Sequence, residues 1–177
     1  VKADGTDLNI SSGAIGGLLR QRAETIEPAV AQIDTFASEL IYQVNRIHSQ
    51  GQGTSGWSSV TSQYAVDDPT IALGALGSGV PFPIENGSFF ITVTNTATGA
   101  DSSHMIQVDP ASMSLDALRS EITSAMFGTG VTASVGDDGK LTIDAPAGSE
   151  LGFSEDSSGA LAALGINSFF QGTSAVD

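Results

Sequence analysis

The side chains in this sequence that could bind a metal ion or act on a substrate are two histidines and three acidic pairs. His48 and His104 lie far apart, and neither has a second histidine or a glutamate at the spacing of a zinc site. The acidic pairs are Asp67–Asp68, Asp137–Asp138 and Glu155–Asp156. None of them belongs to a loop with the alternating oxygen ligands of an EF-hand. We interpret the histidines as a helix-end residue and a strand residue, and the acidic pairs as solvated turns.

Motifs for covalent catalysis and for phosphate binding are also absent from the sequence. The chain has no cysteine, which excludes thiolate nucleophiles and thiolate metal sites. The serine-rich stretch Ser154–Ser158 lacks the Gly-x-Ser-x-Gly context of a nucleophilic serine. No Gly-x-x-x-x-Gly-Lys phosphate loop occurs. We therefore expect a protein that is not an enzyme and that needs no metal or cofactor.

The charge of the chain excludes two classes of partner. Its 20 acidic and 6 basic residues give a net charge of −14, and no lysine or arginine occurs between Ile47 and Leu118. Binding to nucleic acid or to an anionic membrane surface requires basic side chains, so both are disfavoured. No stretch approaches the roughly 18 apolar residues that cross a bilayer. We expect neither nucleic-acid binding nor membrane insertion.

Apolar residues with a regular 4-3 spacing, here called the seam, mark the first third of the chain. The seam consists of Ile26, Val30, Ile33, Ala37, Leu40, Val44 and Ile47. A repeat of 3.5 residues holds these side chains on one narrow face of a helix, which then has to meet another helix. We predict helices over about 13–23 and 26–50, with Pro28 in the first turn of the second. The partner helix could belong to another subunit or to the same one; in the second case Ile33, Leu40 and Val44 would be buried within the chain.

From residue 88 the apolar period changes to two, which indicates strands. We predict hairpins over 89–108 and 131–144, separated by a helix that Ser114 caps. A four-stranded sheet with this helix on one face would bury Ile91, Val93, Ile106, Val108, Leu118, Ile122, Val131, Val135, Leu141 and Ile143. The predicted fold class is therefore α+β, a long helical segment followed by a β-rich lobe with a hairpin-helix-hairpin order. We divide the chain into a helical segment at 1–53, a Gly- and Pro-rich connector at 54–87 and an outer lobe at 88–177.

Three stretches of the sequence carry a family resemblance. The first begins at Gly13-Ala14-Ile15-Gly16-Gly17-Leu18-Leu19 and ends at Asn45-x-x-His48-x-x-Gly51. The second runs from Phe90-Ile91-Thr92-Val93 to Gly139-Lys140-Leu141-Thr142-Ile143. The third is Leu164-Gly165-Ile166-Asn167-x-Phe169-Phe170-x-Gly172-Thr173. In this order they resemble the flagellar hook-associated protein 1 family, which joins hook to filament.

The resemblance implies a structural role outside the cell. It implies an adaptor at the hook–filament junction that acts through packing between subunits. The implied partners are other flagellar axial proteins, copies of the same protein and an export chaperone for the full-length protein. Export would occur without a cleaved signal peptide. Family members carry helical segments at both ends that are missing here, so we expect an internal fragment.

Two other functions stay open at this point. The chain could be another flagellar axial protein, such as a filament cap or a minor hook protein. It could also be a secreted ligand- or carbohydrate-binding module, because its β-rich part is polar and acidic. An aromatic platform or a calcium site would favour that last alternative. The sequence shows neither, although Trp57, the only tryptophan, could be exposed at an interface.

Overall fold

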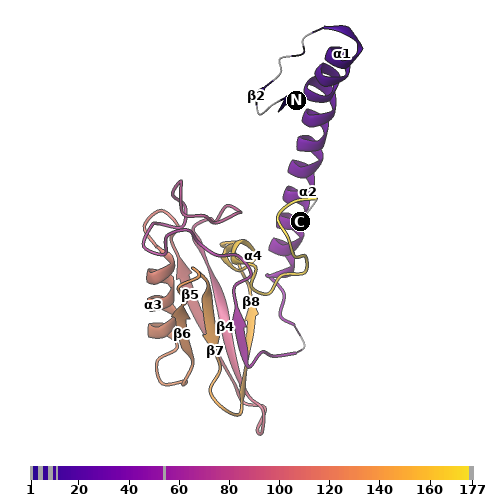
Figure 1. Cartoon of the computed structure of the whole chain (residues 1–177). Coiled ribbons are helices and arrows are strands. Elements are labelled where there is room, and N and C mark those ends of the chain that lie inside the picture. Colours follow the sequence, from indigo (N-terminus) through magenta and orange to yellow (C-terminus); the bar gives the residue numbers. More distant parts are fainter. Residues whose placement is uncertain (1, 4–5, 8–9, 11, 54, 176–177) are drawn as a thin grey trace. The chain divides into compact units, whose positions relative to one another are not determined.

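The computed structural model describes residues 2–3, 6–7, 10, 12–53 and 55–175, in two units that we describe separately (Figure 1). The first unit contains the chain up to Leu40 together with the residues from Gly172 onward. The second unit runs from Ile41 to Gln171 and contains all the longer strands. The last two turns of the long helix therefore belong to the second unit.

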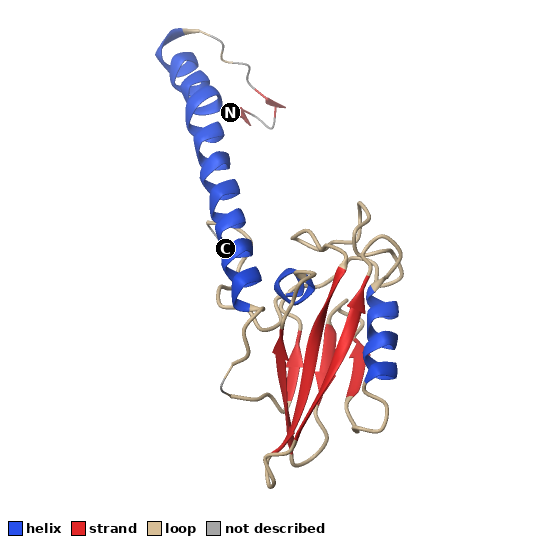
Figure 2. Ribbon diagram, turned by 180° about the vertical axis from the view of Figure 1, so that it is seen from behind, coloured by secondary structure: helices blue, strands red, loops and turns tan. Residues whose placement is uncertain are grey.

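Helical structure runs without interruption from residue 13 to residue 48 (Figure 2, blue). It consists of α1 (Gly13–Gln21), a π-helical segment (Arg22–Ile26) and α2 (Glu27–His48). In the π-helical segment the N–H of Glu27 donates to the carbonyl of Arg22, five residues earlier. Pro28 follows directly, and its ring would clash with the carbonyl four residues before it in a regular α-helix. The wide turn therefore occupies the place where we predicted a break between two helices.

Two antiparallel sheets of three strands build the second unit (Figure 1). The strands are β3 (Ser59–Thr61), β4 (Gly87–Asn95), β5 (Asp101–Val108), β6 (Thr132–Val135), β7 (Leu141–Asp144) and β8 (Ser149–Ser154). β4 lies between β5 and β8, and β7 lies between β3 and β6. An isolated bridge pairs Trp57, which precedes β3, with Leu151 of β8. In the first unit, β1 (Lys2–Ala3) and β2 (Thr6–Asp7) pair with each other.

The prediction of one four-stranded sheet is wrong. The predicted hairpins exist as β4–β5 and β6–β7, but they lie in different sheets. Each hairpin pairs with a strand that we had not predicted to join it, β8 in one case and β3 in the other. Hairpin pairing depends on local turn chemistry, whereas the addition of a distant strand depends on contacts that periodicity does not reveal.

Two helices complete the second unit. α3 (Leu115–Ala125) contacts β5 and β6, and it begins as predicted, with the hydroxyl of Ser114 accepting the N–H of Ala117 at 3.2 Å. α4 (Ala160–Leu164) is fully buried. Gly159 and Gly165, on either side of α4, adopt left-handed φ values of 71° and 70°, which glycine tolerates at no steric cost.

The predicted core is confirmed, and it extends further than predicted. All the residues that we expected in it are buried except Val135, which is partly buried. The segment 54–87, which we expected to be a connector, supplies β3 and the buried side chains Val66, Leu73, Phe82 and Ile84. This segment is therefore part of the lobe.

A fragment of residues 41–171 should unfold cooperatively on heating, whereas a fragment of residues 88–171 should not. The shorter fragment lacks β3 and four large buried side chains. Loss of one such side chain costs about 2–5 kcal/mol, and small domains are stable by only about 5–15 kcal/mol. Circular dichroism melts of both fragments test this expectation. An equally cooperative melt of residues 88–171 would show that the segment 54–87 contributes little.

Candidate functional site

The seam lies on the surface of the described chain. Ile33 is 60% exposed, Leu40 is 48% exposed and Ile47 is 70% exposed. Ile26 and Val30 are also exposed, while Ala37 and Val44 are partly buried. The described chain does not bury Ile33 or Leu40, so of the two alternatives the one with a partner helix outside the described chain stays a prediction. Single exposed apolar residues are ordinary, but a regular stripe of them marks a contact surface.

Asn45 holds the C-terminal end of the second unit against the end of α2. Its side chain is fully buried. Its Oδ1 accepts the N–H of Phe169 at 2.9 Å and the N–H of Phe170 at 2.7 Å. Its Nδ2 donates to the carbonyl of Phe170 at 2.9 Å. One amide thus satisfies three backbone groups, which positions the two phenylalanines.

Asp156 connects the end of α2 to the start of α4. Its carboxylate is fully buried. It accepts the hydroxyl of Ser49 at 3.1 Å and the N–H of Leu161 at 2.9 Å. It also accepts the N–H of Ser158 at 3.1 Å and its hydroxyl at 2.8 Å. Our prediction that Asp156 lies in a solvated turn is wrong, because four donors replace water around the carboxylate. Its neighbour Glu155 is exposed, as predicted.

Of the remaining motif residues, Asn167 bonds to the segment just after α2. Asn167 adopts a left-handed φ of 51°, and its Nδ2 donates to the carbonyls of Gly51 at 3.2 Å and Phe153 at 3.3 Å. Leu164 and Ile166 are buried, and a Cβ on Gly165 would come within 2.6 Å of the Cβ of Gln63. In the first unit, Gly172 has a left-handed φ of 93°. We call Asn45, Ser49, Asp156 and Asn167 the helix-end latch.

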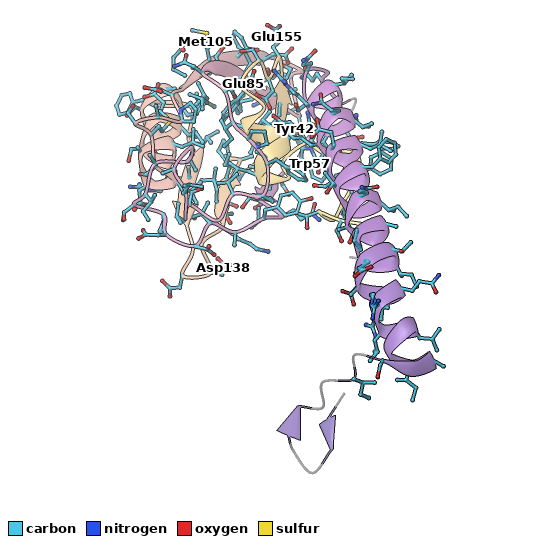
Figure 3. The ribbon with its side chains drawn as sticks, turned by 90° about the horizontal axis from the view of Figure 1, so that it is seen from above. Tyr42, Trp57, Glu85, Met105, Asp138 and Glu155 are labelled. Carbon is cyan, nitrogen blue, oxygen red and sulfur yellow. The ribbon has the colours of Figure 1, made fainter. Side chains whose placement is uncertain are left out.

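Tyr42 also attaches the end of α2 to the lobe, mainly through an aromatic contact. It is buried and stacks on Phe82, with 5.2 Å between ring centroids, and its hydroxyl donates to the carbonyl of Pro83 at 2.7 Å. One turn later, Arg46 forms an ion pair with Glu85 at 2.6 Å. The last turns of α2 are thereby fixed to the lobe along two sides. Figure 3 shows Tyr42 and Glu85 among the side chains of this region.

A shallow apolar groove of about 260 Å³ lies at the end of the seam. It is lined by Val44, Ile47, His48 and Phe169. The rings of His48 and Phe169 are 5.8 Å apart, and Phe169 meets Phe170 edge to face at 4.9 Å. His48 is the last residue of α2, as predicted. Its ring packs against Phe169, which lies near the C-terminal end of the second unit. His104 lies in β5, also as predicted.

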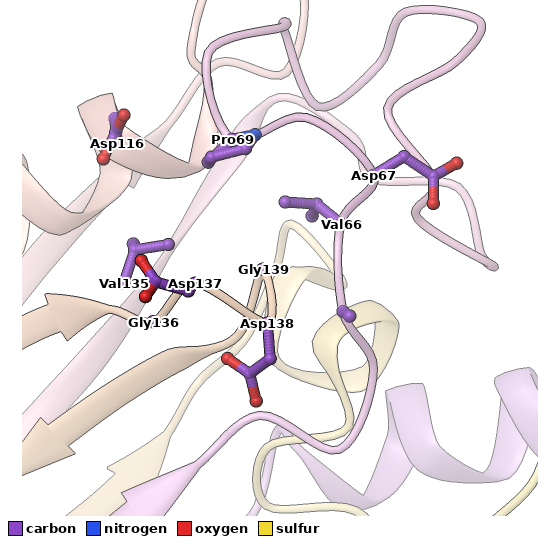
Figure 4. A pocket seen from close by; sticks show the side chains of 10 residues that line it. Val66, Asp67, Pro69, Asp116, Val135, Gly136, Asp137, Asp138 and Gly139 are labelled. Atoms are coloured by element: carbon purple, nitrogen blue, oxygen red, sulfur yellow. The ribbon is translucent and has the colours of Figure 1, made fainter.

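The acidic turns form a separate pocket of about 500 Å³ (Figure 4). Asp67, Asp116, Asp137 and Asp138 line it, and Figure 4 shows that they come from different segments and do not converge on one point. Asp116 is paired with Arg119 at 3.6 Å. Among the residues that the structure describes, no group of three or more His, Cys, Asp or Glu side chains could hold a metal ion.

Two other aspartates stabilise exposed turns in their ionised form. Hydrogen bonds from the hydroxyl and the N–H of Thr70 lower the pKa of Asp68 below its usual value of 3.8. The hydroxyl of Ser112 and the N–H of Ala111 likewise lower the pKa of Asp109. Because the pKa falls on folding, this contribution is present above pH 3.8 and is lost as the pH drops through the lowered pKa. Both groups shape turns.

One family model matches the helical part of the chain. Residues 2–60 match the family model of the flagellar hook-associated protein FlgK helical domain. The matched residues include the whole seam and the Asn45-x-x-His48-x-x-Gly51 motif. The match supports a structural role in the flagellum. No curated protein matches the chain.

Solved structures of the flagellar cap protein FliD are similar to parts of the chain. The D2-D3 domains from Serratia marcescens match with 23% identity and a TM-score of 0.45, over 70% of this chain and 66% of that one. The D1-D2-D3 domains from Escherichia coli match with 17% identity and a TM-score of 0.35, over 77% and 43%. The chain thus spans slightly less than two thirds of the first of these structures.

Sequence reasoning missed Ser49, Asp156 and Tyr42 as parts of the site. Asp156 did carry a signal, because an Asp followed by Ser157, Ser158 and Gly159 favours a turn in which the side chain bonds to the backbone. Ser49 and Tyr42 carried none, since their roles depend on segments about 107 and 41 residues away in the chain.

None of the described helices is long and apolar enough to cross a membrane.

Proposed function

We propose that this protein is a non-enzymatic structural component of the bacterial flagellum that acts as an adaptor at the hook–filament junction. The observation that carries the proposal is the coincidence of the family match at residues 2–60 with an exposed apolar seam on the same residues. A helix with such a seam is suited to lengthwise packing against another helix. The motif resemblance at residues 164–172 supports the junction role over other axial positions.

The seam provides the packing energy in this proposal. Burial of an exposed isoleucine or leucine side chain contributes about 1.5–3 kcal/mol. Ile26, Ile33, Leu40 and Ile47 are each about half exposed or more, so a partner helix would gain several such contributions. Glu27 and Asp34 flank the seam, and with a net charge of −14 copies of the chain repel one another in solution. Close packing is then favoured only where neighbours align the seam.

The lobe has a geometric role in this proposal. The latch fixes the last turns of α2 to the lobe through Asn45, Ser49 and Asp156. In this proposal the lobe sets lateral contacts with neighbouring subunits. The proposed partners are neighbouring axial proteins, copies of the same protein and, before export, a chaperone.

Seam variants should separate folding from assembly. Leu40→Ala and Ile33→Ala should change the free energy of unfolding of the chain by less than about 1 kcal/mol, because both side chains are already exposed. Leu40→Asp in the full-length protein should abolish its incorporation into the flagellum, because it places a charge in a seam that a partner helix would bury. Gln32→Asp, also exposed on α2, is the matched control and should leave incorporation intact. Normal incorporation of Leu40→Asp would remove the seam from the assembly surface.

Immunogold electron microscopy tests the position of the protein in the organelle. An antibody against the lobe should label the boundary between hook and filament of intact flagella. Cells that lack the gene should carry hooks without filaments. Label at the distal filament tip would replace the junction role with a cap role. Absence of label from flagella would overturn the proposal as a whole.

A further inference from the structure

A second groove of about 310 Å³ lies beside the latch, and its chemistry differs from that of the apolar groove. Its polar lining consists of Thr61, Gln63, Asn167, Ser168 and Gln171, and Trp57 provides the aromatic part. His48, Val60 and Gly165 complete the lining. All these residues belong to the second unit. Figure 3 shows Trp57 at a distance from Asp138 of the acidic pocket.

The walls of the groove are held in place by backbone contacts. The N–H and carbonyl of Trp57 both bond to Leu151, at 2.9 and 2.8 Å. Val60 and Thr61 of β3 line the groove next to Trp57. Asn167, which also lines the groove, is fixed by its bonds to Gly51 and Phe153. A site that is already ordered loses little conformational entropy when a ligand binds.

The lining selects a ligand that is neutral and rich in hydroxyl groups. None of the described residues that line the groove is Asp, Glu, Lys or Arg, although the chain carries a net charge of −14. Amide and hydroxyl side chains both donate and accept hydrogen bonds, as every hydroxyl of a sugar does. Trp57 is 49% exposed and offers an apolar surface next to these groups. A purely apolar ligand would leave several polar side chains without partners.

We propose that this groove binds a neutral saccharide, with the indole of Trp57 against a sugar ring and Gln63 and Gln171 bonded to its hydroxyls. The volume is at the lower end of the range for small-molecule sites, about 300–1,000 Å³, which suits one or two sugar rings. An extended peptide is the competing occupant. β3 is three residues long, which makes it a short template for an added strand. The proposal does not depend on the flagellar role.

Fluorescence of the single tryptophan reports on this groove directly. The 177-residue chain is titrated with maltotriose, lactose and the trimer of N-acetylglucosamine, and the indole N–H signal is followed by NMR in parallel. We expect a saturable change with at least one sugar. Gln63→Ala and Gln171→Ala should weaken binding about threefold to tenfold each, the loss of about one hydrogen bond. Gln107→Ala, exposed on β5, is the matched control and should leave binding unchanged.

Three results would overturn the proposal. The first is the absence of a saturable change in both signals with every sugar. The second is binding that both glutamine variants leave unaltered, which would place the sugar elsewhere. The third is displacement of the sugar by a capped trialanine peptide that binds more tightly, which would assign the groove to a peptide.

Discussion

Replacement of Asp156 with alanine should lower the free energy of unfolding of the lobe by about 3–5 kcal/mol. The carboxylate is fully buried and accepts four hydrogen bonds from Ser49, Ser158 and Leu161. A hydrogen bond to a charged group contributes about 1.5–3 kcal/mol, and a buried donor left without an acceptor costs about 1–3 kcal/mol. The N–H of Leu161, in α4, and the N–H of Ser158, just before it, both lose their acceptor. Urea unfolding followed by circular dichroism measures the change.

Asp156→Asn keeps the volume of the side chain but replaces one of its two acceptor oxygens with an NH₂ group. Both carboxylate oxygens accept hydrogen bonds, so either orientation of an amide places an NH₂ group against a donor. This variant should still be destabilised by about 2 kcal/mol. Asp137→Ala, in an exposed turn, is the control and should stay within about 0.5 kcal/mol of the parent. Equal stabilities of Asp156→Asn and the parent would contradict the assigned role.

Asn45→Ala should lower the free energy of unfolding by about 2–4 kcal/mol. The variant loses three hydrogen bonds to Phe169 and Phe170 and leaves a cavity at a fully buried position. It should also loosen Phe169, which the 5.8 Å ring contact places beside His48. Amide hydrogen exchange at Phe169 and Phe170 should accelerate, because both N–H groups lose their acceptor.

Asn95→Ala is a matched control for that variant. The side chain of Asn95 also accepts two backbone N–H groups, from Ala97 and Thr98 at 3.0 Å each, but it is exposed in a hairpin turn. Water can replace these bonds, so the cost should be about 1 kcal/mol or less. If both asparagine variants were destabilised to the same degree, burial at Asn45 would not be the cause of its effect.

Elements that depend on neighbouring residues could be predicted from the sequence. The apolar period of two in residues 89–108 and 131–144 predicted hairpins that the structure contains as β4–β5 and β6–β7. The helix that Ser114 caps followed from a side chain that satisfies a free backbone N–H close by. The buried faces of these elements followed from the same periodicity.

Partners that lie far apart in the chain could not be predicted. β8 pairs with β4 and β3 pairs with β7, which joins segments about 60 and 80 residues apart. No local sequence pattern predicts such a pairing. For the same reason the Gly- and Pro-rich composition of 54–87 suggested a connector, although Val66 and Phe82 from this segment are in the core. The burial of Asp156 depends on donors from the end of α2 as well as from α4.

The sequence by itself determined that one face of the long helix is apolar, because a 3.5-residue spacing follows from helix geometry alone. It also determined that a chain with a net charge of −14 is unsuited to nucleic acid. Only the tertiary structure decided that the seam stays uncovered by the described chain while Asn45 and Ser49, on and just after the same helix, are buried. Which helical residues are covered depends on which distant segments fold back onto them. Asp156, Phe169 and Phe170 bond to residues at the end of α2. The physical reason is that burial is a property of the whole packed unit, whereas periodicity describes one element at a time.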